Sequence, residues 1–326
     1  MTATPAPAGL SLSLPFVPRR VVIGASAHAD IAAMIRAARP ELEVRGAPFT
    51  EITAADLAWA DTYIGFRRPP AAHDMGAVQW VHSTGAGVDG WLGQGLDTGI
   101  LLTRSPESFG PMIAEWAVAR VFAVQQQLVS LMDAQREQRW APRDIARVAG
   151  TRAVLVGTGD IGTHIAAAFA ALGITVTGVS RTGQASHPAF RAVHTVDRLA
   201  DLVADADWLV LSVPDTPASR GLVSRAVLER CRGAVLLNAG RGAVVDEAAL
   251  PDALDNGWLR AAALDVFVTE PLPSTSPLWG HPRVLVSPHI SGLTTVAGAA
   301  EGFLACAESL GRGVWPTWVV DRARGY

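Results

Sequence analysis

A glycine-rich hexapeptide, GTGDIG at residues 157–162, constrains the fold of this chain more than any other segment. An apolar run at 153–156 has the character of a buried strand, and an alanine-rich stretch at 161–172 has the character of a helix. Between a strand and a helix, the first glycine permits a tight turn and the second lets a pyrophosphate approach the helix N-terminus, while the third lets the helix pack on the strand. The hexapeptide therefore predicts a dinucleotide site, with a glycine-rich turn that binds nothing as the alternative.

Strand and helix patterns alternate along both halves of the chain. Apolar runs with strand character lie at 21–24, 61–65, 80–83, 100–103, 153–156, 174–179, 208–213, 234–238, 261–266 and 284–287. Such alternation is typical of parallel sheets with helical crossovers. A chain of 326 residues is long enough for two domains. We therefore predict an α/β protein of two doubly wound domains, one flavodoxin-like and one Rossmann-like, with a cleft between them.

The order of the segments predicts that one domain is built from both ends of the chain. An apolar helix expected at 294–310 follows the last strand of the second series and has no unit of its own to join. We therefore assign residues 1–108 and 290–326 to a discontinuous substrate (catalytic) domain, and residues 109–289 to a dinucleotide-binding domain. Residues 1–18 are rich in proline, alanine and serine and are expected to be a flexible lead-in.

One long helix is expected at 111–138, because this window contains no glycine and no proline after Pro111. Apolar side chains recur along it at helical spacing, and a helix of this length needs a surface to pack on. It is either one more core helix, a helix that crosses between the domains, or a helix through which two copies of the chain associate. We predict the last of these, a homodimer.

Composition and charge exclude several classes of protein. A net charge of −3 gives no reason to expect nucleic acid as a partner. The apolar runs are too short to span a membrane, and the first residues lack the basic and apolar regions of a secretory signal, so we expect a cytoplasmic protein. Cys231 and Cys306 lack the spacing of metal ligands or of a disulfide framework, and no cluster of histidine, cysteine and carboxylate residues indicates a metal site.

The residues at the end of the second Rossmann strand indicate which dinucleotide binds. NAD-binding domains usually carry an acidic residue there, which bonds the ribose 2′-hydroxyl. This chain instead has Ser180, Arg181 and Thr182. A cation with flanking hydroxyl groups suits a 2′-phosphate, so we predict that NADP(H) is preferred, with NAD(H) as the alternative. The other interpretation of Arg181 is a solvated surface arginine.

Three polar residues of the second half, Arg241, Glu270 and His289, have the chemistry of a keto-acid site. Arg241 lies between two glycines directly after a strand, and His289 follows a strand and Pro288, so both are expected at the carboxyl edge of the sheet. A cation, a carboxylate and an imidazole can together hold a 2-keto acid, polarise its carbonyl and protonate it while a hydride arrives. Each residue alone is as readily a surface side chain, but three of them after a dinucleotide motif favour a catalytic site.

With these motifs the chain resembles the D-isomer-specific 2-hydroxyacid dehydrogenases. The similarity runs in order over almost the whole length: VHSTGAGVD at 81–89, GTGDIG at 157–162, SVPDT at 212–216, NAGRG at 238–242, DVFVTEP at 265–271 and SPH at 287–289. An ordered series is far more specific than any one motif. Within the family, the chain is most similar to the glyoxylate/hydroxypyruvate reductase branch, chiefly through Ser180, Arg181 and Thr182.

The resemblance implies a role for each residue of the trio. Arg241 would bind the carboxylate and carbonyl oxygen of the substrate, His289 would exchange the proton, and Glu270 would hold the far side of the imidazole. Backbone groups of Ala86 and Gly87 would bind the substrate carboxylate together with Arg241. Asp265 would hold the carboxamide of the nicotinamide. The cofactor-binding residues would be Gly157, Gly159, Asp160, Ile161, Gly162, Ser180, Arg181, Thr182, Val213, Pro214, Thr216, Ala239 and Asp265.

The resemblance thus predicts an enzyme: an NAD(P)-dependent D-2-hydroxyacid dehydrogenase that reduces a small 2-keto acid, similar to glyoxylate or hydroxypyruvate, to the D-2-hydroxy acid. One alternative is a nucleotide-sensing protein that keeps the fold and regulates a partner, as corepressor members of the family do. The trio argues against this alternative because a sensor needs no proton donor. Another alternative is an NAD-linked dehydrogenase that works in the oxidative direction, and Arg181 is the residue that distinguishes the two cofactors.

Overall fold

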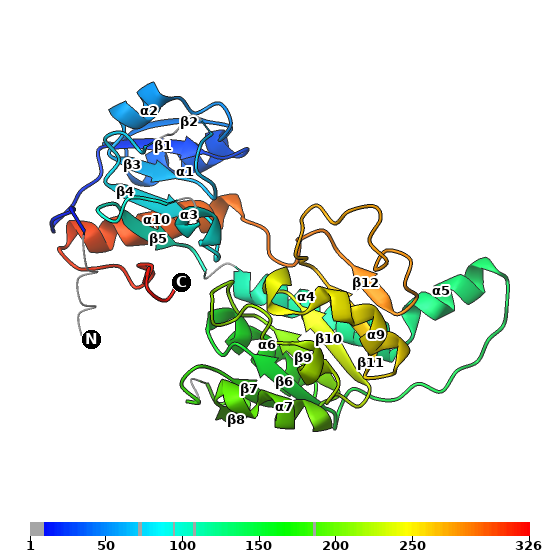
Figure 1. Ribbon diagram of the computed structural model, residues 1–326. Helices are drawn as coiled ribbons and strands as arrows, with labels where there is room; N and C mark the ends of the chain where they lie inside the picture. Colours follow the sequence, from blue (N-terminus) through cyan, green and yellow to red (C-terminus); the bar gives the residue numbers. More distant parts are fainter. Residues whose placement is uncertain (1–9, 71–73, 94, 107–108, 185–186) are drawn as a thin grey trace. The chain divides into compact units, whose positions relative to one another are not determined.

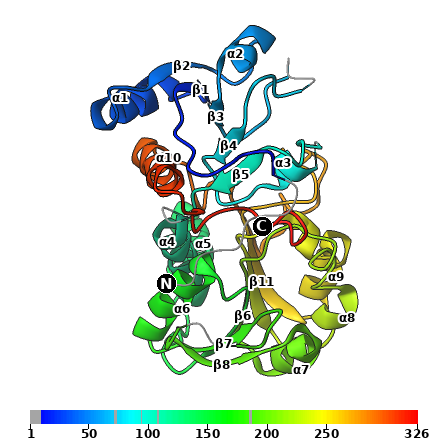
Figure 2. The same cartoon turned by 90° about the vertical axis from the view of Figure 1, so that its left-hand side faces the viewer.

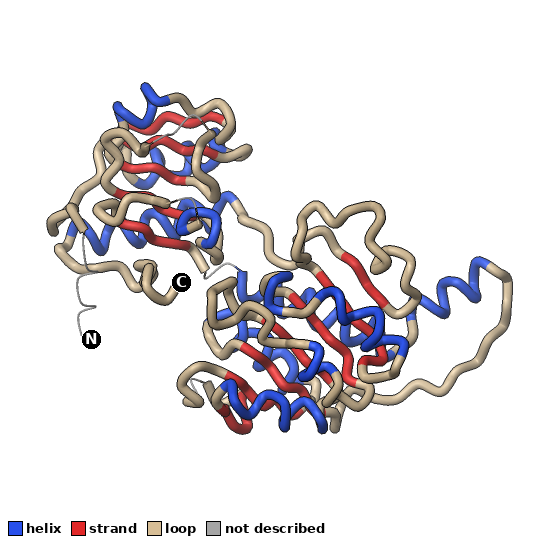
Figure 3. The backbone as a smooth tube through the Cα atoms, in the orientation of Figure 1, coloured by secondary structure: helices blue, strands red, loops and turns tan. Residues whose placement is uncertain are grey.

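The strands of this chain pair in parallel and form two separate sheets (Figure 3). The computed structural model describes residues 10–70, 74–93, 95–106, 109–184 and 187–326. The chain divides into two compact units, of which the first contains residues 1–108 and 294–326 and the second contains residues 109–293. Strands alternate with helices in both units, so the predicted α/β class is confirmed.

The first unit has, within its described residues, a five-stranded sheet with helices on both faces (Figure 2). Its strand order, β2-β1-β3-β4-β5, is that of the flavodoxin-like fold. The strands are β1 (Arg20–Gly24), β2 (Glu43–Ala47), β3 (Thr62–Ile64), β4 (Trp80–Ser83) and β5 (Leu101–Arg104). The helices are α1 (His28–Ala38), α2 (Ala54–Trp59), α3 (Asp89–Leu92) and α10 (Val296–Gly311).

The core of the first unit lies in two layers because successive side chains of a strand point to opposite faces of the sheet. Ile23 of β1 belongs to the layer that contains Phe303 of α10, whereas its neighbour Val22 belongs to the layer with Leu57 of α2 and Trp91 of α3. Helix α10 packs against α1 on the same face. The C-terminal segment therefore completes the core of the unit formed by the N-terminal half of the chain.

The prediction that residues 1–18 form a flexible lead-in is wrong for the described residues 10–18. Leu12 is buried, and Leu10, Leu14 and Phe16 pack against the layer formed by α1 and α10. Two backbone hydrogen bonds fix this segment: the N–H of Ser11 donates to the carbonyl oxygen of Gly99 (3.0 Å), and the N–H of Phe16 donates to that of Leu310 (3.1 Å). Apolar residues at alternate positions cover a core face that would otherwise contact water. Residues 1–9 lie outside the described residues.

The second unit has, among its described residues, a seven-stranded sheet in the order β12-β11-β10-β9-β6-β7-β8. This is the Rossmann order, extended by one strand beyond β11. The strands are β6 (Arg152–Val156), β7 (Thr175–Val179), β8 (Phe190–His194), β9 (Trp208–Leu211), β10 (Ala234–Asn238), β11 (Leu259–Leu264) and β12 (Val284–Val286). The α-helices are α4 (Phe109–Gln125), α5 (Leu128–Arg136), α6 (Asp160–Ala171), α7 (Leu199–Leu202), α8 (Arg225–Leu228) and α9 (Leu250–Asp255). Four short 3₁₀ turns among the described residues are η1 (Val196–Arg198), η2 (Val203–Asp205), η3 (Gly242–Val244) and η4 (Glu247–Ala249).

The single helix predicted at 111–138 is wrong, because α4 ends at Gln125 and α5 begins at Leu128. Gln127 between them has φ 53°, a left-handed conformation that interrupts the helical hydrogen bonds. The side-chain amides of Gln125 and Gln127 bind the returning segment, since they donate to the carbonyl oxygens of Ala146 (3.1 Å) and Asp144 (2.9 Å). These long-range bonds favour the break over a continuous helix.

Beyond this break, α5 and residues 137–147 extend away from the body of the second unit (Figure 1). We call this segment the arm. In contrast, α4 packs along α6 on one face of the sheet.

Within the described ranges, no helix combines the length and the apolar character that a membrane span requires.

Candidate active site

The glycine-rich segment forms the turn between β6 and α6. Gly157 has φ +103°, which favours glycine, and a Cβ atom on it would lie 2.8 Å from the carbonyl oxygen of Ser212. A Cβ atom on Gly162 would overlap the carbonyl oxygen of Gly157, so the third glycine lets the helix sit close to the turn. A Cβ atom on Gly159, the N-cap residue of α6, would meet no described atom within 4 Å. The open space before the N–H groups of the helix N-terminus fits a pyrophosphate. The first turn of the helix contains the two other predicted residues of this motif, Asp160 and Ile161.

The residues predicted to contact a 2′-phosphate lie on the adjoining loop, after β7. The N–H of Gly157 donates to the carbonyl oxygen of Val179 (2.9 Å), which joins the start of this loop to the glycine turn. Ser180 Oγ accepts the N–H of Gly183 (3.1 Å) and so shapes the loop, while the side chains of Arg181 and Thr182 are exposed. The exposed cation of Arg181 is accessible to a phosphate beside the glycine turn, and its contact with a 2′-phosphate stays a prediction.

The loops after β9 and β10 contain the next group of predicted cofactor residues. Val213, Pro214 and Thr216 follow β9, and Ala239 follows β10. The two loops touch, because a Cβ atom on Gly240 would lie 2.8 Å from the carbonyl oxygen of Val213. Strands β6, β9 and β10 are neighbours in the sheet, so these loops and the glycine turn share one carboxyl edge. This edge includes the switch point of the strand order, where ligands bind in such sheets.

Both glycines beside Arg241 are explained by close approaches of the backbone. A Cβ atom on Gly242 would overlap the backbone of Phe267, in the loop after β11. Asn238 shapes the turn from within, since its Oδ1 accepts the N–H of Gly240 (3.1 Å) and its Nδ2 donates to the carbonyl oxygen of Arg241 (3.1 Å). The partly buried guanidinium of Arg241 donates from Nη1 to the carbonyl oxygen of Gly240 (2.8 Å). Arg241 is thus the side chain that this tightly packed turn presents at the carboxyl edge.

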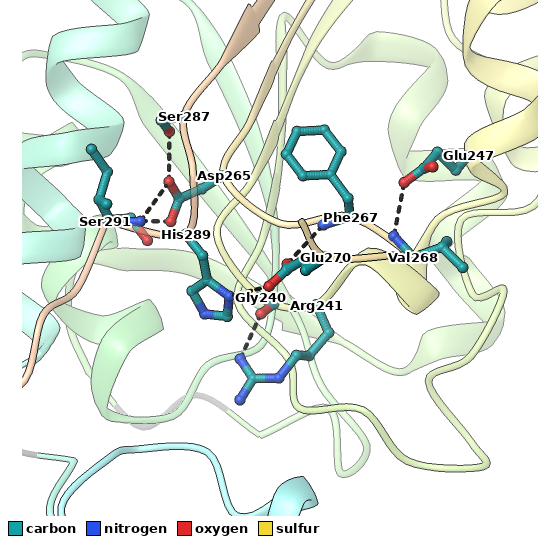
Figure 4. A network of polar contacts seen from close by, with 11 residues as sticks. Gly240, Arg241, Glu247, Asp265, Phe267, Val268, Glu270, Ser287, His289 and Ser291 are labelled. Atoms are coloured by element: carbon teal, nitrogen blue, oxygen red, sulfur yellow. Dashed lines mark hydrogen bonds and ion pairs between the residues drawn. The ribbon is translucent and has the colours of Figure 1, made fainter. Parts of the chain in front are cut away.

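Glu270 connects His289 to the loop after β11 (Figure 4). One carboxylate oxygen, Oε2, lies 2.7 Å from Nδ1 of His289, and the other, Oε1, accepts the N–H of Phe267 (3.0 Å). A carboxylate accepts hydrogen bonds, so Nδ1 is assigned the proton in this contact. The opposite ring nitrogen, Nε2, is then the atom through which His289 can exchange a proton with a substrate. The two side chains are 35% and 41% exposed, which leaves the pair accessible.

Asp265 anchors the loop that carries His289. Its side chain is fully buried, and its Oδ1 accepts hydrogen bonds from the hydroxyl of Ser287 (2.5 Å) and the N–H of Ile290 (3.0 Å). Its Oδ2 accepts the N–H of Ser291 (2.8 Å), and its backbone carbonyl accepts the N–H of His289 (2.8 Å). The sequence had indicated a carboxamide contact for this residue, and that contact stays a prediction.

Ala86 and Gly87, the predicted partners of the substrate carboxylate, belong to the first unit and lie in the loop after β4. Arg104 at the end of β5 donates from Nη1 to the carbonyl oxygen of Ala86 (2.8 Å). Its guanidinium also lies 5.7 Å from the ring centroid of Trp318. Arg104 therefore holds the loop in place. A contact of the two residues with a substrate stays a prediction.

The comparison with known proteins identifies the family. The family model described as "D-isomer specific 2-hydroxyacid dehydrogenase, NAD binding domain" matches residues 118–291, over half of the chain. The chain belongs to the D-isomer-specific 2-hydroxyacid dehydrogenase family. This 2-hydroxyacid dehydrogenase is therefore an oxidoreductase, and its second unit is a nicotinamide-dinucleotide domain.

Relatives of this dehydrogenase include characterised and solved proteins. It is 32% identical over 271 residues to glyoxylate/hydroxypyruvate reductase A of Serratia proteamaculans, a match that covers 79% of this chain and 86% of that protein. A D-isomer-specific 2-hydroxyacid dehydrogenase from Xanthobacter autotrophicus Py2, solved with NADPH and MES, is 30% identical with a TM-score of 0.86 and covers 95% of this chain and 100% of its own. An NADPH-dependent glyoxylate/hydroxypyruvate reductase from Sinorhizobium meliloti, solved with NADP and sulfate, is 26% identical with a TM-score of 0.81 over 94% of this chain and 100% of its own. The predicted similarity to the glyoxylate/hydroxypyruvate reductase branch is confirmed.

Several residues that shape the dehydrogenase site were missed from sequence. Glu247 Oε2 accepts the N–H of Val268 (2.9 Å) and thereby holds the loop after β11 from the side opposite Glu270. Trp116 of α4 donates from Nε1 to Ser287 Oγ (3.0 Å). These partners are far apart in the sequence, and no local pattern marks them. Asn238 is different, because an asparagine at the end of a strand, with a glycine two positions later, is a recognisable turn signal.

Proposed function

We propose that the chain reduces a small 2-keto acid, similar to glyoxylate or hydroxypyruvate, to the D-2-hydroxy acid, with NADPH preferred over NADH. The observation that carries this proposal is the Glu270–His289 pair, with Glu270 Oε2 and His289 Nδ1 2.7 Å apart. Glu270 belongs to the loop after β11, which packs against the turn of Arg241. Such a site supplies one cation for a carboxylate and one ring nitrogen for a proton. The names of the Serratia and Sinorhizobium relatives support the substrate class, and the ligands of the two solved structures support the cofactor.

In this mechanism a nicotinamide dinucleotide, held by the glycine turn after β6 and the loops after β9 and β10, would supply the hydride for the carbonyl carbon. Arg241 binds the carboxylate and the carbonyl oxygen of the keto acid through its guanidinium fork, which polarises the carbonyl. His289 gives its Nε2 proton to the carbonyl oxygen as negative charge develops there. Glu270 stays hydrogen-bonded to Nδ1 and stabilises the charged ring before transfer. One hydride on the carbon and one proton on the oxygen convert the carbonyl group into a hydroxyl group, and the reverse reaction returns both.

The test is oxidation of NADPH and of NADH with glyoxylate, hydroxypyruvate, pyruvate and phenylpyruvate as separate substrates. Turnover of a small keto acid that is faster with NADPH is the expected result. Turnover with NADH alone would retain the reductase and overturn the cofactor preference. Binding of NADPH without turnover of any of these acids would overturn the proposed reaction and favour a nucleotide-sensing protein.

Replacement of Arg181 by alanine is expected to raise the KM for NADPH and to leave the KM for NADH nearly unchanged. A lost charged hydrogen bond to phosphate is worth about 1.5–3 kcal/mol, so the KM for NADPH should rise roughly ten- to hundred-fold. Steady-state kinetics with both cofactors measures this change. Arg232→Ala is the matched control, because Arg232 is also an exposed arginine but precedes β10, at the opposite edge of the sheet. An equal effect of Arg181→Ala on both cofactors would contradict the phosphate contact.

We further propose that the arm forms a homodimer with a second copy of the chain, and that the enzyme works in the cytoplasm. Apolar side chains are exposed along the whole arm, and Trp140 is 96% exposed. The others, between 41% and 52% exposed, are Leu128, Val129, Met132 and Ile145. A segment that extends from its own unit with an apolar surface is suited to exchange with an identical segment, because a two-fold interface is self-complementary.

Light scattering after size-exclusion chromatography is expected to give the mass of a dimer for the native chain. Trp140→Glu combined with Met132→Glu should give a monomer, because each change places a charge in an apolar interface. Val196→Glu, at another exposed apolar position of the same unit, serves as the control and should leave the dimer intact. A native chain that is monomeric at micromolar concentration would contradict the proposal.

A further inference from the structure

A chain of buried hydrogen bonds links α4 to the loop that carries His289. Trp116 of α4 is 6% exposed, and its indole N–H donates to Ser287 Oγ at 3.0 Å. The Ser287 hydroxyl is 4% exposed and donates in turn to Asp265 Oδ1 at 2.5 Å. Because the indole N–H can only donate, the direction of both bonds is determined: indole to hydroxyl, hydroxyl to carboxylate. The carboxylate of Asp265 thus accepts a hydrogen bond from the Ser287 hydroxyl, and the oxygen of that hydroxyl accepts one from Trp116, 171 positions away in the sequence.

The same carboxylate controls the backbone around His289. It accepts the N–H groups of Ile290 and Ser291, the two residues directly after His289, while the Asp265 carbonyl accepts the N–H of His289 itself. His289 has φ 55°, a left-handed conformation that is unfavourable for a residue with a side chain. Such a backbone persists where its surroundings impose it, and here the imposing group is the anion of Asp265. The direction of the imidazole, and with it the contact to Glu270, depends on this conformation.

A cation also acts on this network. The guanidinium of Arg120 lies 4.8 Å from the ring centroid of Trp116, so the indole is held from both its face and its N–H edge. Burial lowers the pKa of Arg120, and the negative charge of Asp265 opposes this shift. The positive charge of Arg120 therefore offsets part of the desolvation cost of the buried Asp265 carboxylate, while Ser287 keeps its hydrogen bond to that carboxylate.

We propose that Trp116 and Ser287 are positioning residues for His289: they orient the Asp265 carboxylate that holds the His289 backbone in its left-handed conformation and aims the imidazole at Glu270. The proposal rests on the proposed function, in which His289 is the proton donor. Apolar side chains on α4 could fill the volume that Trp116 and Ser287 occupy. The series of hydrogen bonds from Trp116 through Ser287 also specifies one orientation of the Asp265 carboxylate. Neither residue needs to touch the substrate or the cofactor for this role.

The second unit offers a matched control for this network. Trp208 of β9 is fully buried, donates from Nε1 to Thr151 Oγ1 at 2.9 Å, and has the guanidinium of Arg260 4.9 Å from its ring centroid. This arrangement repeats the indole, hydroxyl and guanidinium of the Trp116 network. Thr151 lies before β6, at the amino edge of the sheet, so its loss removes an equivalent bond far from the loop of His289.

The experiment compares Trp116→Phe and Ser287→Ala with Trp208→Phe and Thr151→Ala. All four variants should lose thermal stability, because each lacks the indole–hydroxyl bond of its network, and each alanine variant lacks the second bond of its hydroxyl as well. The first pair should lower kcat roughly ten- to hundred-fold through misplacement of the proton donor, with little change in the KM for NADPH, while the second pair keeps kcat. In histidine-labelled protein without substrate, the ring signal of His289, assigned by its loss in His289→Asn, should move in the first pair alone. Ser287→Thr keeps the hydroxyl and should restore both the signal and kcat.

Two results would overturn the proposal. One is an unmoved His289 ring signal in folded Ser287→Ala and Trp116→Phe. The other is a loss of kcat in the Trp208 and Thr151 variants as large as that in the first pair, which would mean a general loss of rigidity. Failure of the proposed reaction is a separate outcome, since it would appear as retained turnover in His289→Asn, whereas the ring signal is measured without any turnover.

Discussion

Asparagine in place of His289 is expected to lower kcat for reduction of a 2-keto acid roughly a thousand-fold, within the range that general acid catalysis contributes. Asparagine is chosen because it tolerates the left-handed backbone, φ 55°, that His289 adopts. The loop after β12 should therefore keep its conformation while the proton donor is lost. Steady-state kinetics with saturating NADPH and keto acid measures the change.

His281→Asn is the control for this substitution. His281 is a partly buried histidine of the same unit that precedes β12, at the opposite edge of the sheet, with its Nε2 3.5 Å from Asp255 Oδ1. Its replacement should leave kcat within about two-fold of the native value, because the side chain lies away from the candidate active site. If His289→Asn retained more than a tenth of the native kcat, the assignment of His289 as proton donor would have to be abandoned.

Replacement of Arg241 is the second change with a large expected effect. Arg241→Ala should lower kcat/KM for the keto acid roughly a thousand-fold or more, because about 4 kcal/mol of charged hydrogen bonding to the carboxylate and the developing oxyanion is lost. Arg241→Lys keeps the charge and loses the fork, so it should recover a small part of this loss. Kinetics over a range of keto-acid concentrations separates the two contributions, since carboxylate binding affects KM and oxyanion stabilisation affects kcat.

The binding of NADPH controls for the integrity of these Arg241 variants. The glycine turn lies between β6 and α6, whereas Arg241 follows β10, so the dissociation constant of NADPH, measured by fluorescence, should remain close to the native value. Near-normal turnover of the keto acid by Arg241→Ala would show that another cation binds the substrate. Loss of both NADPH binding and turnover would instead indicate that the turn between Gly240 and Gly242 had changed its conformation.

Much of the site could be located from the sequence because its residues follow parallel strands. Gly157, Arg241 and His289 each come directly after an apolar run, and the carboxyl ends of parallel strands meet at one edge of a sheet. The glycines beside Arg241 have a cause that only the fold reveals, since a Cβ atom on Gly242 would overlap the backbone of Phe267. The order of strands and polar residues along the sequence thus predicted the edge of the sheet on which these residues lie. The packing of the loops explains why the turn of Arg241 contains glycines.

The two predictions from sequence that proved wrong, a single helix at 111–138 and a flexible segment at 1–18, failed for one physical reason. A helix across 111–138 follows from local propensity, but Gln125 and Gln127 bind carbonyl oxygens about twenty residues later, at Ala146 and Asp144, and the helix breaks between them. Residues 10–18 have the composition of a loose lead-in, yet Phe16 bonds to Leu310 at the other end of the chain. In both segments a distant partner decided the conformation, and propensity within the segment carries no information about such a partner.

By itself, the sequence determined the α/β class, because this class depends on short-range patterns of strand, glycine and helix. The same patterns predicted the dinucleotide turn and the roles of Arg241, Glu270 and His289, and those roles stay predictions. The tertiary structure alone decided that Glu270 bonds to Nδ1 of His289 at 2.7 Å and that the carboxylate of Asp265 accepts three hydrogen bonds from the loop around it. It also decided that Trp116 reaches Ser287 across 171 residues. The physical reason is that buried polar groups must find partners wherever the fold brings them, and those partners have no fixed spacing along the chain.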